Sequence, residues 1–259
     1  MSDSHRSRRK LFAHSAHKTI GVSTGFAAFR ACDPTTGRAT ADRPDTPLRV
    51  CPVWGATEYR PEQALTALQE YLESDYDVRC SRAWGEVDHD LQWPAEAGRP
   101  DCMLLVGGRI EIAGEPLDRV KEYCLRGGSI VGLGSTGKIF ENWPEFDEEI
   151  LGGDVRGDWG DEHEVEVRIV EEKRGHPILQ GVRPFVSSGC LYRRASLAPD
   201  AAVLLTGTAT KGSEPVAWSR RYRGGRFFCT SLGSLDDFSR PDFLRLLANA
   251  LFWTTRPRW

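Results

Sequence analysis

The pattern of apolar and polar positions in the first half of the chain alternates between strand-like runs and helical faces. The strand-like runs lie at residues 48–53, 76–80, 102–106 and 129–133; the run at 76–80 is the weakest, and the run at 102–106 is continuous enough in apolar residues to be buried on both faces. Helices are predicted to begin at Pro61 and Pro116, because proline is favoured in the first helical turn. Gly127 suits the end of the second helix. This order predicts a doubly wound, mostly parallel sheet with helices on both faces.

The second half of the chain is richer in strand patterns. Charged and apolar residues alternate over residues 164–170, which is typical of a half-exposed strand. Further strands are predicted at residues 202–205, 215–219 and 226–231, with a hairpin turn at Arg223, Gly224 and Gly225. A final helix is predicted from Pro241, because apolar residues recur after it at helical spacing. No low-complexity linker divides residues 47–257, which predicts a single domain there.

Residues 1–46 are predicted to be a leader outside this domain. Residues 1–41 carry seven Lys or Arg and two Asp, whereas the rest of the chain is net acidic. The segment 7–12, SRRKLF, resembles a twin-arginine signal, and residues 39–41, ATA, resemble a small-residue cleavage site. The sequence therefore predicts export to the periplasm. The alternative is a basic tail on a cytoplasmic protein.

Charge and hydropathy exclude two classes of partner. The acidic body lacks the basic surface that nucleic-acid binding requires. No apolar run approaches the roughly 18 residues that span a bilayer. We therefore expect neither nucleic-acid binding nor a membrane span.

The turn after residues 129–133 is the first candidate for a ligand site. It reads GLGSTGKIF from Gly132 to Phe140 and offers backbone amides, Ser135 and Lys138. Glycine-rich turns at strand ends bind ligands in α/β proteins. The turn also matches GxGxxG and most of a Walker A loop, but it follows at least three candidate strands, and Ile139 replaces the magnesium-binding Ser or Thr. Nucleotide binding is therefore the less favoured alternative.

Few residues outside the leader can transfer protons at neutral pH. Only His89, His163 and His176 remain, and His176 precedes a proline in GHPIL, which favours a turn role. His89 lies in a polar segment, so proton transfer is nearly confined to His163. The seven cysteines form no CxxC pair, so they indicate no metal site, and their pairing is left open.

Four stretches carry a resemblance to a known family. They are YCLRGGSIVGLGS, FENWPEFDEEILGG, GHPILQGV and the block EPVAWSRRYRGGRFFCTSLGSLDDFSRPDFLRLLANALFW. From Val120 to Trp253 the chain resembles the ThuA-like (trehalose-utilisation) family. The resemblance implies a flavodoxin-like fold related to class I glutamine amidotransferases, and a role in sugar metabolism, especially that of disaccharides.

The chain departs from the family pattern at several positions. The nucleophilic cysteine of the amidotransferases would fall near Gly134, so glutamine hydrolysis is not expected. Relatives usually carry a histidine in or shortly after this turn, where this chain has Gly134 and Lys138. They also tend to read SLGH near the end, where this chain has Ser234. A further histidine-rich stretch of the family corresponds to residues 157–163.

These departures leave a modified set of candidate site residues. Lys138, Asp161 and His163 are the candidate catalytic residues, because an amine and a carboxylate–imidazole pair can transfer protons. The candidate substrate-binding residues have a polar or cationic group, a free backbone, or a ring that stacks on a sugar; they are Arg109, Gly134, Ser135, Trp159 and Ser234.

Structural explanations stand beside each of these roles. The segment with Asp158, Asp161 and His163 contains metal-ligand types, but it also reads as an exposed polar loop. Trp159 is equally consistent with packing, and Asp237 with capping of the final helix.

Two function hypotheses follow. One is an exported sugar-processing enzyme, and the other is a catalytically inactive carbohydrate-binding module on the same fold. Both have a small carbohydrate as partner. The sequence assigns no cofactor, metal or oligomeric state.

Overall fold

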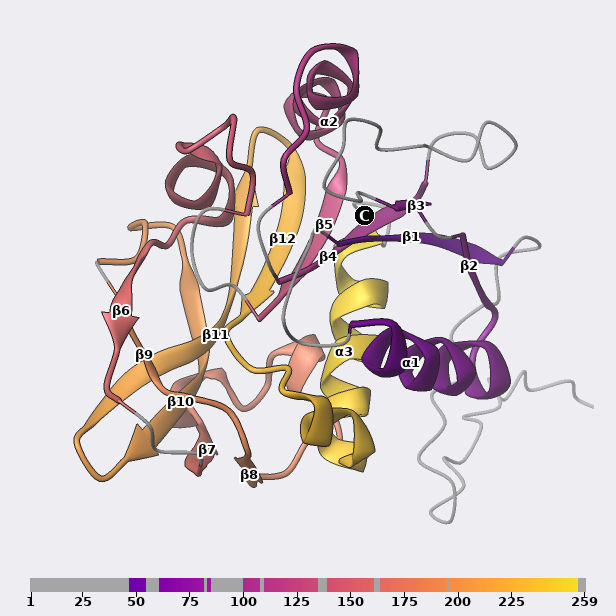
Figure 1. The fold of residues 1–259 in the computed structure, drawn as a ribbon. Coiled ribbons are helices and arrows are strands. Elements are labelled where there is room, and N and C mark those ends of the chain that lie inside the picture. The colour runs from indigo at the N-terminus through magenta and orange to yellow at the C-terminus, as the bar shows by residue number, and fades with distance from the viewer. Residues whose placement is uncertain are drawn as a thin grey trace, which may run out of the picture. The chain divides into compact units, whose positions relative to one another are not determined.

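The structure is a computed structural model, shown in Figure 1. It describes residues 47–54, 61–81, 83–84, 100–107, 110–134, 139–160, 164–194 and 196–255. The leader predicted at residues 1–46 lies outside these ranges, so export and the boundaries of the domain stay predictions.

Five strands form the parallel part of the main sheet, in the order β2-β1-β4-β5-β12. Their bounds are β1 (Leu48–Trp54), β2 (Val78–Cys80), β4 (Cys102–Val106), β5 (Ser129–Leu133) and β12 (Gly225–Thr230). A short strand, β3 (Ala83–Trp84), also pairs with β1. Numbered along the parallel part alone, the order is 2-1-3-4-5, which is the flavodoxin-like order. The predicted fold class is confirmed.

The sheet continues with antiparallel strands from the second half of the chain, in the order β11-β10-β7-β8. Their bounds are β7 (Val165–Ile169), β8 (Phe185–Ser187), β10 (Ala202–Ala209) and β11 (Gly212–Tyr222). Arg223 and Gly224 form the predicted hairpin turn with positive φ values of 46° and 89°. A second small sheet pairs β6 (Val155–Asp158) with β9 (Tyr192–Arg194). The short strands β3, β6, β8 and β9 lie outside the strands that the sequence pattern predicts.

Helices cover both faces of the parallel strands (Figure 1). The helices α1 (Pro61–Asp75) and α3 (Pro241–Thr255) pack on one face, while α2 (Glu115–Leu125) and the π-helix η1 (Asp147–Leu151) pack on the other. Three 3-10 helices complete the described elements: η2 (Glu171–Lys173), η3 (Pro177–Leu179) and η4 (Leu235–Ser239). No helix in the described ranges is long and apolar enough to cross a membrane.

Strand β4 shows how the sequence builds this layered core. Cys102 and Leu104 belong to the cluster that packs with α1 and α3, whereas Met103 and Leu105 belong to the cluster that packs with α2 and η1. Alternate residues of a strand face opposite sides, so a strand covered on both sides must be apolar throughout. Each buried side chain of this size contributes about 1.5–3 kcal/mol to folding.

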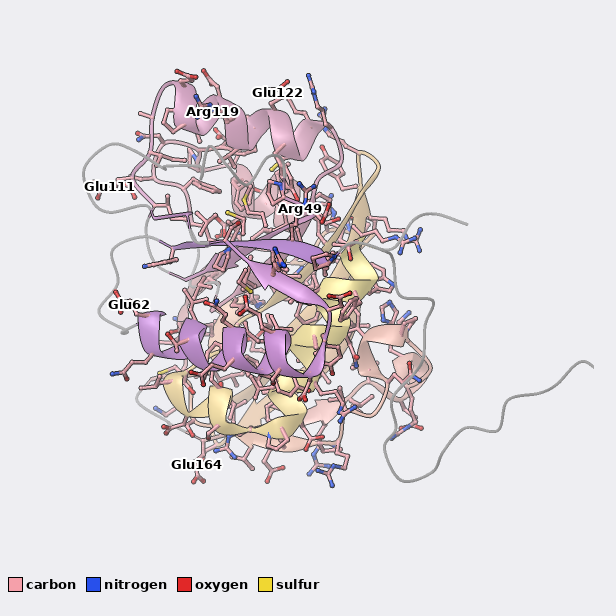
Figure 2. The ribbon with its side chains drawn as sticks, turned by 90° about the vertical axis from the view of Figure 1, so that its right-hand side faces the viewer. Arg49, Glu62, Glu111, Arg119, Glu122 and Glu164 are labelled. Atoms are coloured by element: carbon pink, nitrogen blue, oxygen red, sulfur yellow. The ribbon has the colours of Figure 1, made fainter. Side chains whose placement is uncertain are left out.

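The helix ends follow local sequence signals. Gly127 has a φ of 73° after α2, and Gly128 N donates to Tyr123 O at 2.9 Å. This confirms the predicted role of Gly127, because the left-handed conformation is least costly for glycine. On the outer side of α2, Arg119 pairs with Glu115, and Arg126 pairs with Glu122 (Figure 2).

Candidate functional site

Three glycines lie together where β4, β5 and β12 end. Gly107 N donates to Leu133 O at 2.9 Å, and Gly134 N donates to Leu232 O at 3.0 Å. A Cβ atom on Gly107 would lie 2.9 Å from Gly134 O, and one on Gly233 would lie 3.7 Å from Gly134 N. A side chain at Gly107 would therefore clash with the Gly134 backbone, whereas one at Gly233 would make only an ordinary contact. This carboxyl edge of the parallel strands is the place where ligands bind in such sheets.

Gly134 forms the sharp turn at the end of β5. Its φ of 58° is left-handed, and a Cβ atom there would meet only Gly107 Cα, at 3.9 Å. The turn has room for a small side chain, but the sequence supplies none. Gly132, by contrast, lies within β5, and a Cβ atom there would meet Cys229 Sγ at 3.7 Å. The first glycine of the GxGxxG and Walker A-like motifs is therefore part of the strand and not of the loop.

Ser234 follows β12 and lies at the same edge as Gly134. Ser234 and Asp237 form the capping box at the start of η4, yet the buried Ser234 Oγ makes no hydrogen bond of normal geometry within the part of the chain that the structure describes. A buried hydroxyl without a partner costs about 1–3 kcal/mol, which is why such groups usually have one. Ser234 thus offers a hydroxyl to an incoming polar group.

A buried carboxylate fixes the turn that carries Ser234. Asp237 has no exposed surface, and its Oδ2 accepts hydrogen bonds from Gly233 N at 2.9 Å and Ser234 N at 3.1 Å. The same oxygen accepts from Ser187 Oγ at 2.8 Å, which ties the end of β8 to this turn. Asp237 therefore positions Ser234, whereas the sequence pattern assigns it to capping the final helix. The spacing S-x-x-D from Ser234 is the local signal for the observed role.

The segment after β8 connects Ser234 with Trp159. A Cβ atom on Gly189 would lie 3.8 Å from Ser234 Cβ, and Leu191 O accepts from Trp159 N at 3.0 Å. The indole Nε1 of Trp159 donates to Glu214 Oε1 at 3.1 Å. The ring packs on Gly212, where an added Cβ atom would lie 2.8 Å from it. These contacts give Trp159 a packing role beside the edge, and its stacking on a sugar stays a prediction.

Five predicted site residues lie outside the described ranges: Arg109, Ser135, Lys138, Asp161 and His163. Their nearest described neighbours in sequence are Ile110, Gly134, Ile139, Gly160 and Glu164. One of these, Gly134, belongs to the edge described above. The catalytic and substrate-binding roles of these five residues therefore stay predictions.

Buried thiols are poor candidates for a nucleophile. The cysteines of the described ranges form no disulfide with one another. Burial raises the pKa of Cys102 and of Cys124 to about 12 and raises the pKa of Cys229 further, so these thiols are protonated at neutral pH.

His176 has the turn role that the sequence predicts. Its Nδ1 accepts from Ile178 N at 3.3 Å at the start of η3, and its Nε2 lies 3.4 Å from Ser219 Oγ. Burial, followed by the charges of Lys173 and Arg221, lowers its pKa. In the described ranges, no three His, Cys, Asp or Glu side chains are arranged to hold a metal ion.

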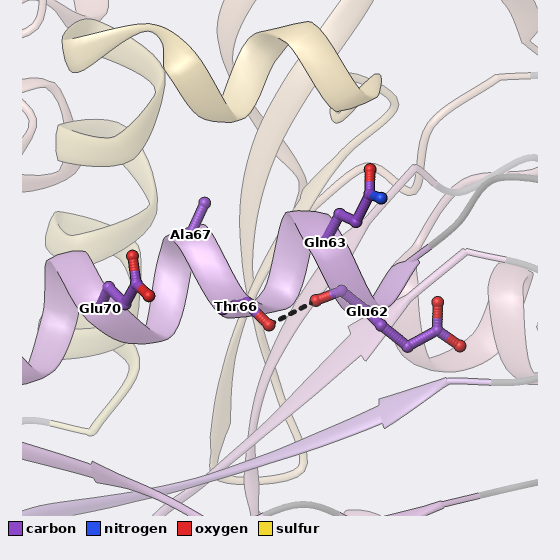
Figure 3. Close-up of a pocket in the computed structure, with 5 residues that line it drawn as sticks. All are labelled: Glu62, Gln63, Thr66, Ala67 and Glu70. Atoms are coloured by element: carbon purple, nitrogen blue, oxygen red, sulfur yellow. Dashed lines mark hydrogen bonds between the residues drawn. The ribbon is translucent and has the colours of Figure 1, made fainter.

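A shallow hollow of about 390 Å³ lies along α1 (Figure 3). Its lining residues all come from this helix: Glu62, Gln63, Thr66, Ala67 and Glu70. Thr66 Oγ1 is already bonded to Glu62 O at 2.7 Å. The hollow lacks the convergent polar groups of a binding site.

The strand order and the glycine-lined carboxyl edge define a flavodoxin-like α/β protein with a candidate ligand site at that edge. The family model ThuA, described as trehalose utilisation, matches residues 53–254. The chain therefore belongs to the ThuA family, and this membership supports a role related to sugar metabolism.

Solved structures agree with the assignment of the fold. A putative ThuA-like protein from Parabacteroides merdae ATCC 43184 is 18% identical, with a TM-score of 0.60 over 81% of this chain and 90% of that one. Another from Bacteroides uniformis ATCC 8492 is 18% identical, with a TM-score of 0.59 over 83% of this chain and 94% of that one. A cytoplasmic protein from Salmonella typhimurium LT2 is 13% identical, with a TM-score of 0.55 over 80% of this chain and all of that one (100%). A comparison with curated proteins finds no match.

Proposed function

We propose that this protein binds a carbohydrate, in particular a disaccharide or its keto derivative, at the edge formed by Gly107, Gly134 and the turn Gly233–Ser234. The observation that carries the proposal is the buried hydroxyl of Ser234, which makes no hydrogen bond of normal geometry to the described residues and lies beside the glycine backbones of this edge. A sugar hydroxyl both donates and accepts hydrogen bonds, so it would satisfy this group. Membership of the trehalose-utilisation family favours a sugar over other hydroxyl-rich ligands.

The described residues at this edge favour binding over catalysis. Gly134 carries no nucleophile, and Ser234 has no histidine or carboxylate bonded to its Oγ among the described residues. Catalysis would depend on Lys138, Asp161 and His163, acting as proton donors and acceptors. A sugar-processing enzyme and an inactive sugar-binding module therefore share the binding step and differ at these three residues.

The binding step is tested by a thermal-stability screen with trehalose, other disaccharides and their keto derivatives. A ligand that prefers the native state raises Tm, by an amount that grows with ligand concentration. We expect at least one disaccharide to raise Tm and calorimetry to give one site per chain. If no sugar changes Tm at millimolar concentration, the proposed function is wrong.

Ser234→Ala tests where the sugar binds. We expect this variant to weaken binding about three- to tenfold, because one hydrogen bond contributes about 0.5–1.5 kcal/mol. Its folding stability should fall by only about 0.5–1 kcal/mol, the usual cost of losing an N-cap side chain, because Ser234 caps the short helix η4. Ser239→Ala is the matched control, since Ser239 is exposed at the other end of η4 and bonds only to Asp236 O.

Incubation of the bound sugar with the protein, followed by NMR, separates the enzyme from the binding module. Product formation that is lost in His163→Ala would identify the enzyme. Tight binding without product, unchanged by His163→Ala, would identify the module.

A further inference from the structure

Two arginines with little exposure lie on or beside β11, and both stack on aromatic rings of that strand. Arg220 lies over the ring of Tyr222, with its guanidinium carbon 4.4 Å from the ring centroid, and Arg194 lies over Trp218 at 4.2 Å. The two guanidinium groups therefore have similar aromatic support. They differ in their polar partners.

Arg220 is fully paired. Its Nε atom donates to Asp200 Oδ1 at 2.8 Å and Oδ2 at 3.0 Å. Its Nη1 atom donates to Glu149 O at 2.6 Å and Ile150 O at 3.3 Å. This side chain is 8% exposed, and its charge is compensated by a carboxylate. Arg220 is a structural residue that holds η1 against the sheet.

Arg194 has no such compensation. Its Nε donates to Pro215 O at 3.2 Å, but both terminal nitrogens, Nη1 and Nη2, are buried without a hydrogen-bond partner among the described residues. Burial lowers the pKa of Arg194 to about 10, and the carboxylates of Glu214, Asp147 and Asp154 offset this only from a distance, without an ion pair. A buried charge without a partner is strongly unfavourable, so such a group calls for a ligand or an ion.

The place of Arg194 connects it with the candidate site. Asp147 is one of the carboxylates whose charge raises the pKa of Arg194. Its Oδ2 accepts a hydrogen bond from Ile139 N at 3.0 Å and so anchors the chain that follows the Gly134 turn. Trp218, on which Arg194 stacks, packs in the same buried cluster as the apolar residues of η1. Arg194 therefore lies on the face of the sheet that η1 covers.

We propose that Arg194 is an oxyanion-binding residue, which receives a carboxylate or phosphate group through Nη1 and Nη2. The Nε edge is occupied by Pro215 O, so the two free nitrogens define an end-on approach. An arginine binds a planar carboxylate or a phosphate with two parallel hydrogen bonds in such a geometry. Stacking on Trp218 fixes the plane of the fork before the anion arrives.

This inference rests in part on the proposed function, because it adds an acidic group to the expected sugar. The ligand class becomes a sugar acid or a sugar phosphate rather than a neutral disaccharide. An inorganic oxyanion would satisfy the same two nitrogens, so the experiment must separate these sources.

The experiment measures Tm of the full chain in gluconate, in inorganic phosphate, in neutral glucose and in sodium chloride at matched ionic strength. We expect gluconate or phosphate to raise Tm by about 3–6 °C over chloride at ten times its Kd. A response to gluconate alone identifies a sugar acid, and a response to phosphate alone identifies a phosphate group. A response to neither overturns the inference.

Two substitutions of equal charge change locate the effect. In Arg194→Met the anion-dependent shift should disappear, whereas in Arg220→Met it should persist relative to that variant's own Tm in chloride. In chloride, Arg194→Met should melt at or above the wild-type temperature, because methionine has no charge to desolvate. Equal anion shifts in both variants would place binding elsewhere and would overturn the inference.

A third variant guards against a folding defect. Arg194→Lys keeps the charge but loses the two-nitrogen fork, so we expect about tenfold weaker anion binding. Unchanged binding in Arg194→Lys would contradict the end-on geometry and overturn the inference.

The pattern of ligands separates this inference from the proposed function. A shift with neutral disaccharides but not with oxyanions would leave the proposed function standing and remove this inference alone. A shift with oxyanions but not with neutral disaccharides would contradict the proposed function and support the oxyanion site.

Discussion

The turns that end β5 and β12 meet at one edge, but they are held in different ways. After β12, the buried carboxylate of Asp237 accepts from Gly233 N and Ser234 N at 2.9 and 3.1 Å. After β5, Gly134 N donates to Leu232 O at 3.0 Å, and that carbonyl belongs to the other turn. The turn after β5 therefore depends on the turn after β12, while the latter is fixed by a charge.

This difference shows how one short segment can organise a site. The turn after β12 also binds the end of β8 through Ser187 Oγ, so three chain segments meet at Asp237. Hydrogen bonds to a charged acceptor are roughly twice as strong as neutral ones. Substitutions in the turn after β12 should consequently disturb the edge more than substitutions in the turn after β5.

The largest effect is expected for Asp237→Asn. The substitution removes the charge that three hydrogen bonds share and places an amide donor near Ser188 N, which lies 3.4 Å from Oδ1. It also removes the ion pair with Arg240. We expect the free energy of unfolding to fall by about 2–4 kcal/mol, measured by urea denaturation.

The control for this prediction is the neighbouring carboxylate, Asp236, which is exposed. Asp236→Asn carries the same charge change and should cost less than about 0.5 kcal/mol. Amide hydrogen exchange adds a local measurement. In Asp237→Asn, the amides of Gly233 and Ser234 should exchange faster, and Gly134 should follow because its acceptor lies in the same turn. If the Gly134 amide stays protected from exchange while the Gly233 amide does not, the two turns are independent.

The second effect in size is expected for Gly233→Ala. Gly233 has a φ of 125°, a region that is essentially confined to glycine, although an added Cβ atom would meet its neighbours at ordinary distances of 3.7–3.9 Å. The strain should cost about 2 kcal/mol and shift Ser234. Urea denaturation and sugar affinity should therefore both decline. If Gly233→Ala has wild-type stability, the turn after β12 adapts to the new side chain at no cost in free energy. The conformation of this turn would then depend less on Asp237 than the hydrogen bonds indicate.

The sequence predicts the parallel half of the fold well because that half is covered on both sides. Strands such as β4 must be apolar throughout, and the apolar run is visible without knowledge of any partner. The strands β8 and β9 have three residues each and no continuous apolar run, and each has an exposed residue at its centre. Their pairing depends on distant segments, so no local pattern predicts them.

The candidate site shows the same limit at the level of single residues. Gly134 and Ser234 could be predicted because each follows an apolar strand, and strand ends of a parallel sheet meet at one edge. Arg194 could not, because Tyr192–Arg194 reads as a polar segment. Its burial is caused by Trp218 and Pro215, which come from another strand. Long-range packing, and not local sequence, makes this arginine unusual.

The smallest effect is expected for Gly134→Ala, which tests the dependent turn directly. The φ of 58° lies in the left-handed region that other residues adopt at a cost of about 1 kcal/mol, and the added Cβ atom would meet only Gly107 Cα at 3.9 Å. Urea denaturation should therefore show about half the loss found for Gly233→Ala. Since both positions have room for a methyl group, the difference between the two variants reports backbone conformation and support from Asp237, rather than steric clash. A larger loss for Gly134→Ala than for Gly233→Ala would reverse the comparison and make the turn after β5 the one on which the edge depends.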